Sequence, residues 1–195
     1  MLFRSDSAKS RMEEGWSVAM QRIIEQNPEA FALIKGGKDY PDMEGTVLFY
    51  PLWGGTLVIA DIAGLPYKKG DCENRFHGFH IHEGSSCTSG GTEEFGNTGM
   101  HWNPGNCPHP EHAGDFPPLL QNRGYAFLVF FTDRFLPEEV VGHTVVIHEN
   151  RDDFQMQPSG NSGAKIACGE IKSNLQCKLN KKAPHISQNV RCCFI

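Results

Sequence analysis

The sequence predicts an all-β domain, built as a β-sandwich or β-barrel, and three observations lead to that prediction. Seven short segments are enriched in β-branched and aromatic residues. Turn signals such as Gly36-Gly37, Gly54-Gly55 and Asn122-Arg123-Gly124 separate these segments. Short strands at this spacing are typical of sandwiches and barrels and not of α/β folds.

The predicted elements follow one another from residue 8 to residue 171. Residues 8–27 come first, and their apolar positions suit an amphipathic helix that ends at Asn27-Pro28. Those apolar positions are Trp16, Val18, Met20, Ile23 and Ile24. The strands are expected at 30–36, 45–52, 55–65, 76–83, 125–133, 142–149 and 164–171.

Two long segments fit no strand, and they divide the strand-rich region. Residues 84–122 are rich in Gly, Pro, Asn and His, and residues 149–163 form a second predicted loop. Loops of this length in a compact domain are usually functional or disordered. With 195 residues, the chain is most simply one domain with extensions. We expect a helical extension at 1–28, the β-domain at 29–172, and a cysteine-containing, poorly ordered tail at 173–195.

Composition and charge exclude several classes of partner. The formal net charge of -5 argues against non-specific nucleic-acid binding, which needs a basic surface. No apolar run approaches the roughly 18 residues that a membrane-spanning helix needs. The first residues, MLFRSDSAKS, lack the apolar stretch of a secretory signal, so the expected location is the cytoplasm. The last four, CCFI, have the form of a prenylation motif, but no polybasic segment precedes them.

The segment HGFHIHEGSSC, residues 77–87, contains three histidines within a predicted strand. Alternate strand residues share a face, so His80 and His82 would point the same way, about 7 Å apart. That arrangement suits two ligands of one metal ion. Taken alone, such a pair is more often two solvent-facing histidines.

A second cluster lies in the first long loop, in HWNPGNCPHPEHAGD. It contains His101, His109, His112 and Asp115. Three imidazoles and one carboxylate make a suitable tetrahedral zinc set, and the alternative is a histidine-rich loop without a metal. A third piece, HENRDD, places His148 at the end of a predicted strand and Asp152 four residues later.

These segments together resemble the copper/zinc superoxide dismutases. GFHIHEGSSC, GMHWNPGNCPHPEHAGD, GHTVVIHENRDD and GNSGAKIACG occur in the order of the family's motifs. The resemblance covers roughly residues 29–172 and is closer to bacterial members, because the loop between His148 and Lys165 is short. It implies an eight-stranded Greek-key β-barrel or sandwich, immunoglobulin-like in architecture.

The resemblance also implies a role for each residue. Copper would be bound by His80, His82, His101 and His148. Zinc would be bound by His101, His109, His112 and Asp115. Asp152 would hydrogen-bond ligand imidazoles of both metals, and His77 would be a buried supporting histidine and not a ligand. Cys87 and Cys168 would form the family's disulfide.

The activity implied is dismutation of superoxide to O₂ and H₂O₂. Copper would cycle between Cu(II) and Cu(I), which zinc cannot do, and His101 would bridge the two ions. The family's anion-guiding arginine is replaced here by Lys165, which keeps the charge but loses the planar fork. The catalytic residues expected are therefore His101 and Lys165, with a surface lysine of no function as the alternative for the second.

Other interpretations stay open at this point. A metal-binding or copper-delivery module with the same barrel and weak catalysis is the main alternative, and a domain holding zinc alone is another. The resemblance leaves monomer and homodimer open. A second disulfide between Cys72 and Cys107 is compatible with the sequence, because both cysteines flank the metal-binding segments.

Overall fold

The computed structural model describes residues 27–67 and 75–174. This part of the chain contains nine strands. The strands are β1 (Ala30–Gly36), β2 (Glu44–Leu52), β3 (Gly55–Ala63), β4 (Phe76–His77), β5 (Phe79–His82), β6 (Leu119–Leu120), β7 (Ala126–Thr132), β8 (Thr144–His148) and β9 (Lys165–Ser173). Two short 3-10 helices, η1 (Gly96–Thr98) and η2 (Pro137–Val140), lie in the connections.

The all-β prediction is confirmed for this part of the chain. The helix expected at 8–27 falls almost wholly on residues 1–26, which lie outside the described residues, as does most of the tail expected at 173–195. The eight-strand count and the Greek-key order stay predictions. Among the described residues, no helix has the length and apolar character needed to cross a membrane.

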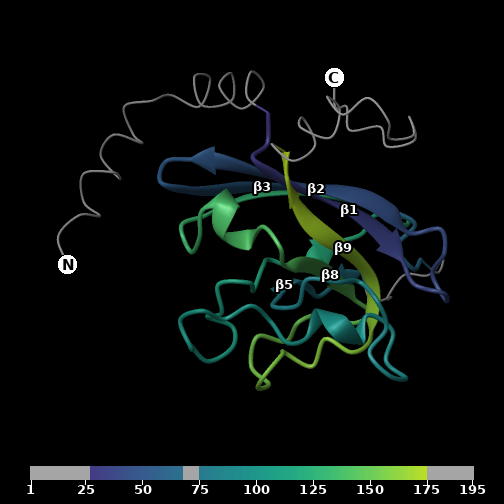
Figure 1. Cartoon of the computed structure of the whole chain (residues 1–195). Coiled ribbons are helices and arrows are strands. Elements are labelled where there is room, and N and C mark those ends of the chain that lie inside the picture. Colours follow the sequence, from purple (N-terminus) through teal and green to yellow (C-terminus); the bar gives the residue numbers. More distant parts are fainter. Residues whose placement is uncertain (1–26, 68–74, 175–195) are drawn as a thin grey trace, which may run out of the picture.

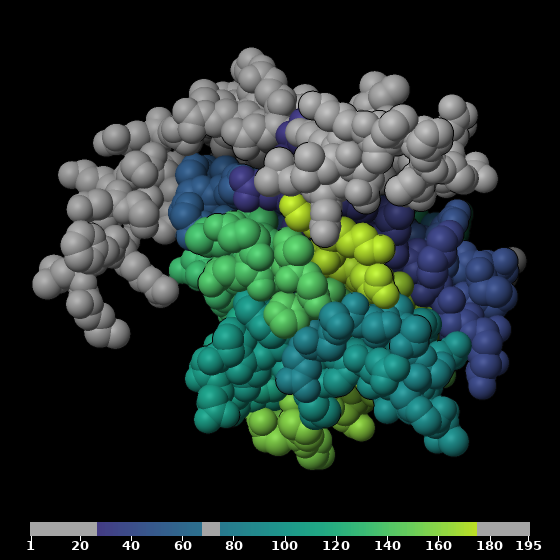
Figure 2. Space-filling model, viewed as in Figure 1, coloured from purple at the N-terminus to yellow at the C-terminus, as the bar shows by residue number. Residues whose placement is uncertain are grey.

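Seven of the strands form one sheet, in the order β5-β8-β9-β1-β2-β3-β7, and β4 pairs with β6 separately. Neighbouring strands of the large sheet are antiparallel. The sheet curls, so that β1, β2 and β3 lie above β5 and β8 in Figure 1, with β9 running between the two levels. A space-filling view shows the two long loops, teal and yellow-green, gathered at the end opposite β1–β3 (Figure 2).

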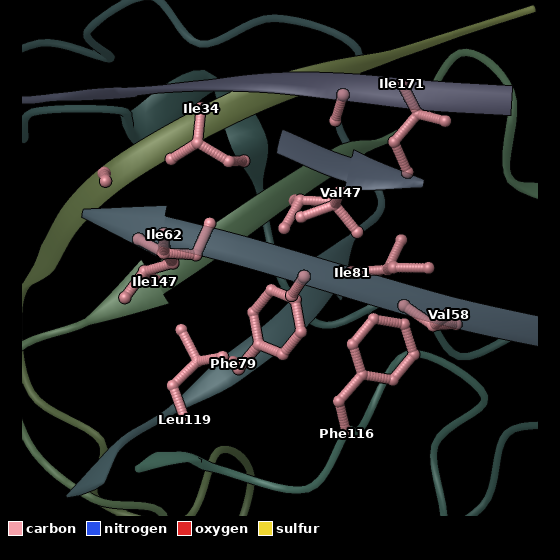
Figure 3. Packing of buried hydrophobic residues seen from close by; sticks show 14 of the residues in the cluster. Ile34, Val47, Val58, Ile62, Phe79, Ile81, Phe116, Leu119, Ile147 and Ile171 are labelled. Atoms are coloured by element: carbon pink, nitrogen blue, oxygen red, sulfur yellow. The ribbon is translucent and has the colours of Figure 1, made fainter. Parts of the chain in front are cut away.

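The hydrophobic core fills the space inside the curl. Ile34 and Val47 come from one side of it, and Phe79, Ile81 and Ile147 come from the other (Figure 3). All five side chains are fully buried. Burying each such side chain stabilises the fold by about 1.5–3 kcal/mol. The core therefore fixes β5 and β8, the strands that carry three of the predicted metal ligands, against the rest of the sheet.

The strand expected over 76–83 is two strands in the structure, and Gly78 separates them. The Gly78 amide donates to the Asn150 carbonyl at 2.7 Å, and the Gly78 carbonyl accepts from the His148 amide at 2.8 Å. A side chain at this position would run into Ser162 and His148. β4 thus turns away to pair with β6, while β5 continues beside β8.

Candidate metal centre

The first long loop folds back along β5, on the edge that β8 leaves open. The Trp102 amide donates to the Ile81 carbonyl at 2.8 Å, and the Ile81 amide donates to the Gly114 carbonyl at 2.9 Å. Isolated bridges pair His82 with His101 and His80 with Asp115. This pairing satisfies the edge of β5 and brings ligands that are far apart in the sequence next to one another.

The folding-back assembles two groups of buried side chains. The first, here the four-histidine group, consists of His80, His82, His101 and His148. The second, here the Asp115 group, consists of His101, His109, His112 and Asp115. In each group, one nitrogen or oxygen of every residue lies within 4.8 Å of the others. These are the two ligand sets that the resemblance implied, and His101 belongs to both.

His101 presents a different ring nitrogen to each group. Its Nδ1 lies 2.7 Å from Asp115 Oδ1. Its Nε2 is buried without a hydrogen-bond partner in the described part of the chain. The centroid of its ring is 3.9 Å from that of His80 and 4.9 Å from that of His82. One imidazole therefore connects the two groups directly.

Three rings of the four-histidine group are held from outside by oxygen atoms. His82 Nδ1 lies 2.9 Å from the Gly99 carbonyl, and His148 Nδ1 lies 3.3 Å from the Gly163 carbonyl. His80 Nε2 lies 2.8 Å from Asp152 Oδ2. A carbonyl or carboxylate oxygen can only accept, so each of these nitrogens donates its proton. The other nitrogen of each ring is then left with a free lone pair.

The lone pairs point inward, which is the arrangement that a metal ion requires. His82 Nε2 and His148 Nε2 face each other at 3.2 Å. His80 Nδ1 is buried without a hydrogen-bond partner among the described residues, and His109 Nδ1 and His112 Nδ1 lie 3.0 and 3.2 Å from Asp115 Oδ2 without forming a hydrogen bond to it. A buried polar atom left without a partner costs free energy unless something else satisfies it. The residues present therefore fit two cations, one in each group.

Burial keeps His80, His82 and His148 neutral near pH 7. It lowers the pKa of His80 and His82 well below the usual value, and neighbouring imidazoles act in the same direction. Burial also lowers the pKa of His148 to about 4. For Asp115, burial alone would raise the pKa, but the hydrogen bond with His101 and the nearby histidines bring it below its ordinary value. These ligand atoms are thus in the deprotonated state that metal binding needs.

Asp152 connects the two groups from behind. Its Oδ1 lies 2.9 Å from His109 Nε2 and accepts a hydrogen bond from the Phe154 amide at 2.8 Å. Its Oδ2 faces His80. One carboxylate thus orients a ring of each group, which is how a carboxylate behind metal-binding histidines fixes their orientation. His77, by contrast, lies outside both groups, and its Nδ1 donates to the His148 carbonyl at 3.1 Å.

A disulfide and an arginine hold the first long loop in place. Cys87 and Cys168 are bonded, and they are 81 residues apart in the sequence. Arg134 Nη1 donates to the carbonyls of His112, Pro110 and Asp115 at 2.9, 3.3 and 3.4 Å. No local sequence pattern pointed to Arg134, because its partners lie about twenty residues away. Cys107 is an exposed free thiol, and Cys72 lies outside the described residues.

Lys165 begins β9 beside the four-histidine group. Its Nζ donates to the Gly99 carbonyl at 3.3 Å, the same carbonyl that accepts from His82. Its side chain is 11% exposed and forms an ion pair with Glu93. Lys165 therefore lies beside the four-histidine group, as the resemblance implied, and is paired with a carboxylate to which no local sequence pattern pointed.

Comparison with known proteins agrees with the family resemblance that implied these two ligand sets. The family model for copper/zinc superoxide dismutase matches residues 43–171. A Cu-Zn superoxide dismutase of Deinococcus radiodurans is 37% identical over 147 residues, which are 66% of this chain and 77% of that protein. The extracellular Cu-Zn superoxide dismutase of Mus musculus is 31% identical over 141 residues, or 67% of this chain and 53% of that protein. The solved structure of the Cu/Zn superoxide dismutase from Brucella abortus superposes with a TM-score of 0.60 at 26% identity, covering 73% of this chain and 99% of that one.

Proposed function

The chain belongs to the copper/zinc superoxide dismutase family, and we propose on this basis that it dismutates superoxide. Two superoxide anions and two protons give one O₂ and one H₂O₂. The observation that carries the proposal is His101, whose two ring nitrogens face two separate groups of buried ligands. A domain that held zinc alone would need the Asp115 group but not the four-histidine group.

The cofactors are copper and zinc. His80, His82, His101 and His148 would hold copper, and His101, His109, His112 and Asp115 would hold zinc. When bound, copper supplies one-electron chemistry between Cu(II) and Cu(I), and zinc supplies a fixed positive charge without redox chemistry. Four imidazoles suit copper, while three imidazoles and a carboxylate suit zinc.

The protein's own residues orient the ligand imidazoles, transfer protons and attract the substrate. His101 Nε2 is the atom at which we place proton uptake and release, because His101 Nδ1 stays engaged with Asp115 at 2.7 Å. Asp152 keeps the protons of His80 and His109 on their outer nitrogens, so that the inner nitrogens stay free. Lys165 supplies a positive charge beside the four-histidine group, which attracts an anionic substrate.

The finer fold and the assembly complete the proposal. The curled seven-stranded sheet and the separate β4–β6 pair are compatible with the family's eight-stranded Greek-key barrel. We place this barrel at 29–172. A homodimer and a cytoplasmic location stay predictions, and sedimentation of the full chain and fractionation of cells test them.

Metal content and activity measured together test the function. We expect the protein loaded with both ions to hold about one copper and one zinc per chain and to suppress superoxide-driven reduction of cytochrome c. His82→Ala should lower this activity more than about 100-fold, because a copper ligand is lost while the zinc ligands remain. His143→Gln is the matched control, since His143 belongs to neither group and its Nδ1 contacts the Glu83 carbonyl. Copper at full stoichiometry without activity would leave a metal-binding module and refute the enzyme.

A further inference from the structure

The ammonium group of Lys165 is shared between a carboxylate and a carbonyl. Its Nζ lies 3.0 Å from Glu93 Oε1 and 3.3 Å from the Gly99 carbonyl oxygen. The lysine side chain is 11% exposed, whereas that of Glu93 is 63% exposed. An ammonium has three protons to donate, and two of them point to these oxygens. Part of the positive charge that this lysine could offer to an anion is therefore offset by Glu93.

The backbone of Glu93 is anchored, so the carboxylate is delivered to this place by the fold. The Glu93 amide donates to the Gly90 carbonyl at 3.2 Å, and the Glu93 carbonyl accepts from the amides of Gly90 and Gly96 at 3.0 and 3.2 Å. The adjacent Glu94 points elsewhere, because its Oε1 accepts from the Lys38 amide at 2.7 Å. The two neighbouring glutamates therefore have different partners, and only Glu93 is paired with Lys165.

The Gly99 carbonyl connects Lys165 to the four-histidine group. It accepts from His82 Nδ1 at 2.9 Å as well as from Lys165. Gly99 has φ 69° and ψ -145°, a backbone conformation that residues other than glycine adopt only with strain. A glycine at this position allows the carbonyl to face both donors. Lys165 would keep this contact if Glu93 lost its charge, so the ammonium would stay beside the site.

We propose that Glu93 is a positioning residue that acts through Lys165. Its carboxylate occupies the lysine ammonium in competition with small anions and thereby limits their binding at the four-histidine group. This inference rests on the proposed function, because it concerns the anion that the copper site attracts. An incoming anion must displace the carboxylate or use the remaining proton of an ammonium whose charge Glu93 partly offsets. Lysine is especially sensitive to this competition, because it lacks the five donors with which an arginine could serve both partners.

Azide binding to the copper-loaded protein tests the proposal without a measurement of activity. Azide is a small monovalent anion, and its binding to Cu(II) is followed by visible absorption. At low ionic strength we expect Glu93→Gln to lower the azide dissociation constant by about three- to tenfold, and salt to reduce the difference. Glu170→Gln is the matched control: it removes the same charge from an ion pair with Lys172 near the other end of β9, and should change binding less than twofold.

A second pair of variants tests whether Glu93 acts through the lysine. Lys165→Met should weaken azide binding, and adding Glu93→Gln to it should change the constant less than twofold. The effect of Glu93→Gln is thus measured twice, once in the parent and once in the Lys165→Met background. If Glu93→Gln tightens azide binding by the same factor in both, Glu93 acts by its own charge, and the positioning role is refuted. Equal binding by Glu93→Gln and the parent would also refute it, yet leave the dismutase function intact. Failure of the parent to bind copper would instead overturn the function itself.

Discussion

Strands β2 and β3 and strands β5 and β8 belong to one sheet, but different interactions hold them. β2 and β3 pair over nine residue positions and bury apolar side chains such as Val47, Phe49 and Ile62. β5 and β8 pair over four positions and bury His80, His82 and His148. The first pair is held by apolar packing and by its backbone pairing. The second contains imidazoles whose inner nitrogens need a metal, and it depends on long-range polar contacts and a disulfide.

The largest expected effect is loss of stability of the metal-free protein on acidification. The pKa of His148 is about 4 in the folded protein, against about 6.5 when unfolded. The pKa values of His77, His80, His82 and His112 are lowered as well, chiefly by burial. Between pH 6.5 and 4, these histidines bind protons in the unfolded chain but not in the folded one. The stability present above pH 6.5 is therefore lost as pH falls toward 4. His148 alone would contribute about 3 kcal/mol, and the others add to it.

Urea unfolding of the metal-free protein at successive pH values measures this loss. Hydrogen exchange should show that β5 and β8 open first, while β2 and β3 keep their protection. The metal-loaded protein should lose stability at lower pH, because bound ions hold the imidazoles deprotonated. A urea midpoint that is constant from pH 7 to pH 4.5 in the metal-free protein would contradict the difference between the two strand pairs.

The next effect concerns the disulfide that ties the first long loop to β9. Cys87→Ser opens the crosslink between residues 81 positions apart. Loop-closure entropy for a span of this length predicts a loss of about 4–5 kcal/mol in the free energy of unfolding. Cys107→Ser is the control, because Cys107 is an exposed free thiol. Urea unfolding under non-reducing conditions compares the two, and similar small losses would show that the loop does not need this crosslink.

Asp152→Asn should then affect the two metal-binding groups unequally. Asp152 Oδ1 accepts from both His109 and the Phe154 amide, so an asparagine would keep its oxygen there. Its amide nitrogen would face His80 Nε2, which also donates, and the His80 ring would have to move its proton to the inner nitrogen. Copper affinity should fall by about 10- to 100-fold, and zinc affinity by much less.

Competition titrations with a chelator for each ion measure these affinities. Asp153→Asn is the control, since Asp153 accepts hydrogen bonds from the amides of Gln155 and Met156 in its own turn. A variant at Asp152 that loses zinc first would show that the carboxylate supports the Asp115 group more than the four-histidine group. Equal loss of both ions would show that it supports the two groups alike, and either result would contradict the prediction.

The same comparison explains what could be predicted from the sequence. The strands of the apolar half follow from alternation of side chains, a property of neighbouring residues. The histidines of the other half could be grouped because their motifs resemble a known family. Contacts made across the chain left no such trace: Gly78 divides a segment that alternates like one strand, because its backbone bonds to His148 and Asn150. Glu93 and Lys165 are 72 positions apart, so nothing local signals their ion pair.

Arg134 gives the smallest predicted effect and tests whether long-range polar contacts outside the ligands matter at all. Its guanidinium reaches the carbonyls of His112 and Asp115, two residues of the Asp115 group, and pairs with Glu111 at 3.2 Å. Arg134→Lys keeps the charge but loses the planar fork, so zinc affinity should fall by about three- to tenfold, with copper affinity unchanged. Lys35→Met is the control: its ion pair with Glu44 is exposed, with 73% and 68% of the two side chains accessible, and should contribute less than about 1 kcal/mol. Equal effects of the two substitutions would mean that the loop is held by its ligands and the disulfide alone.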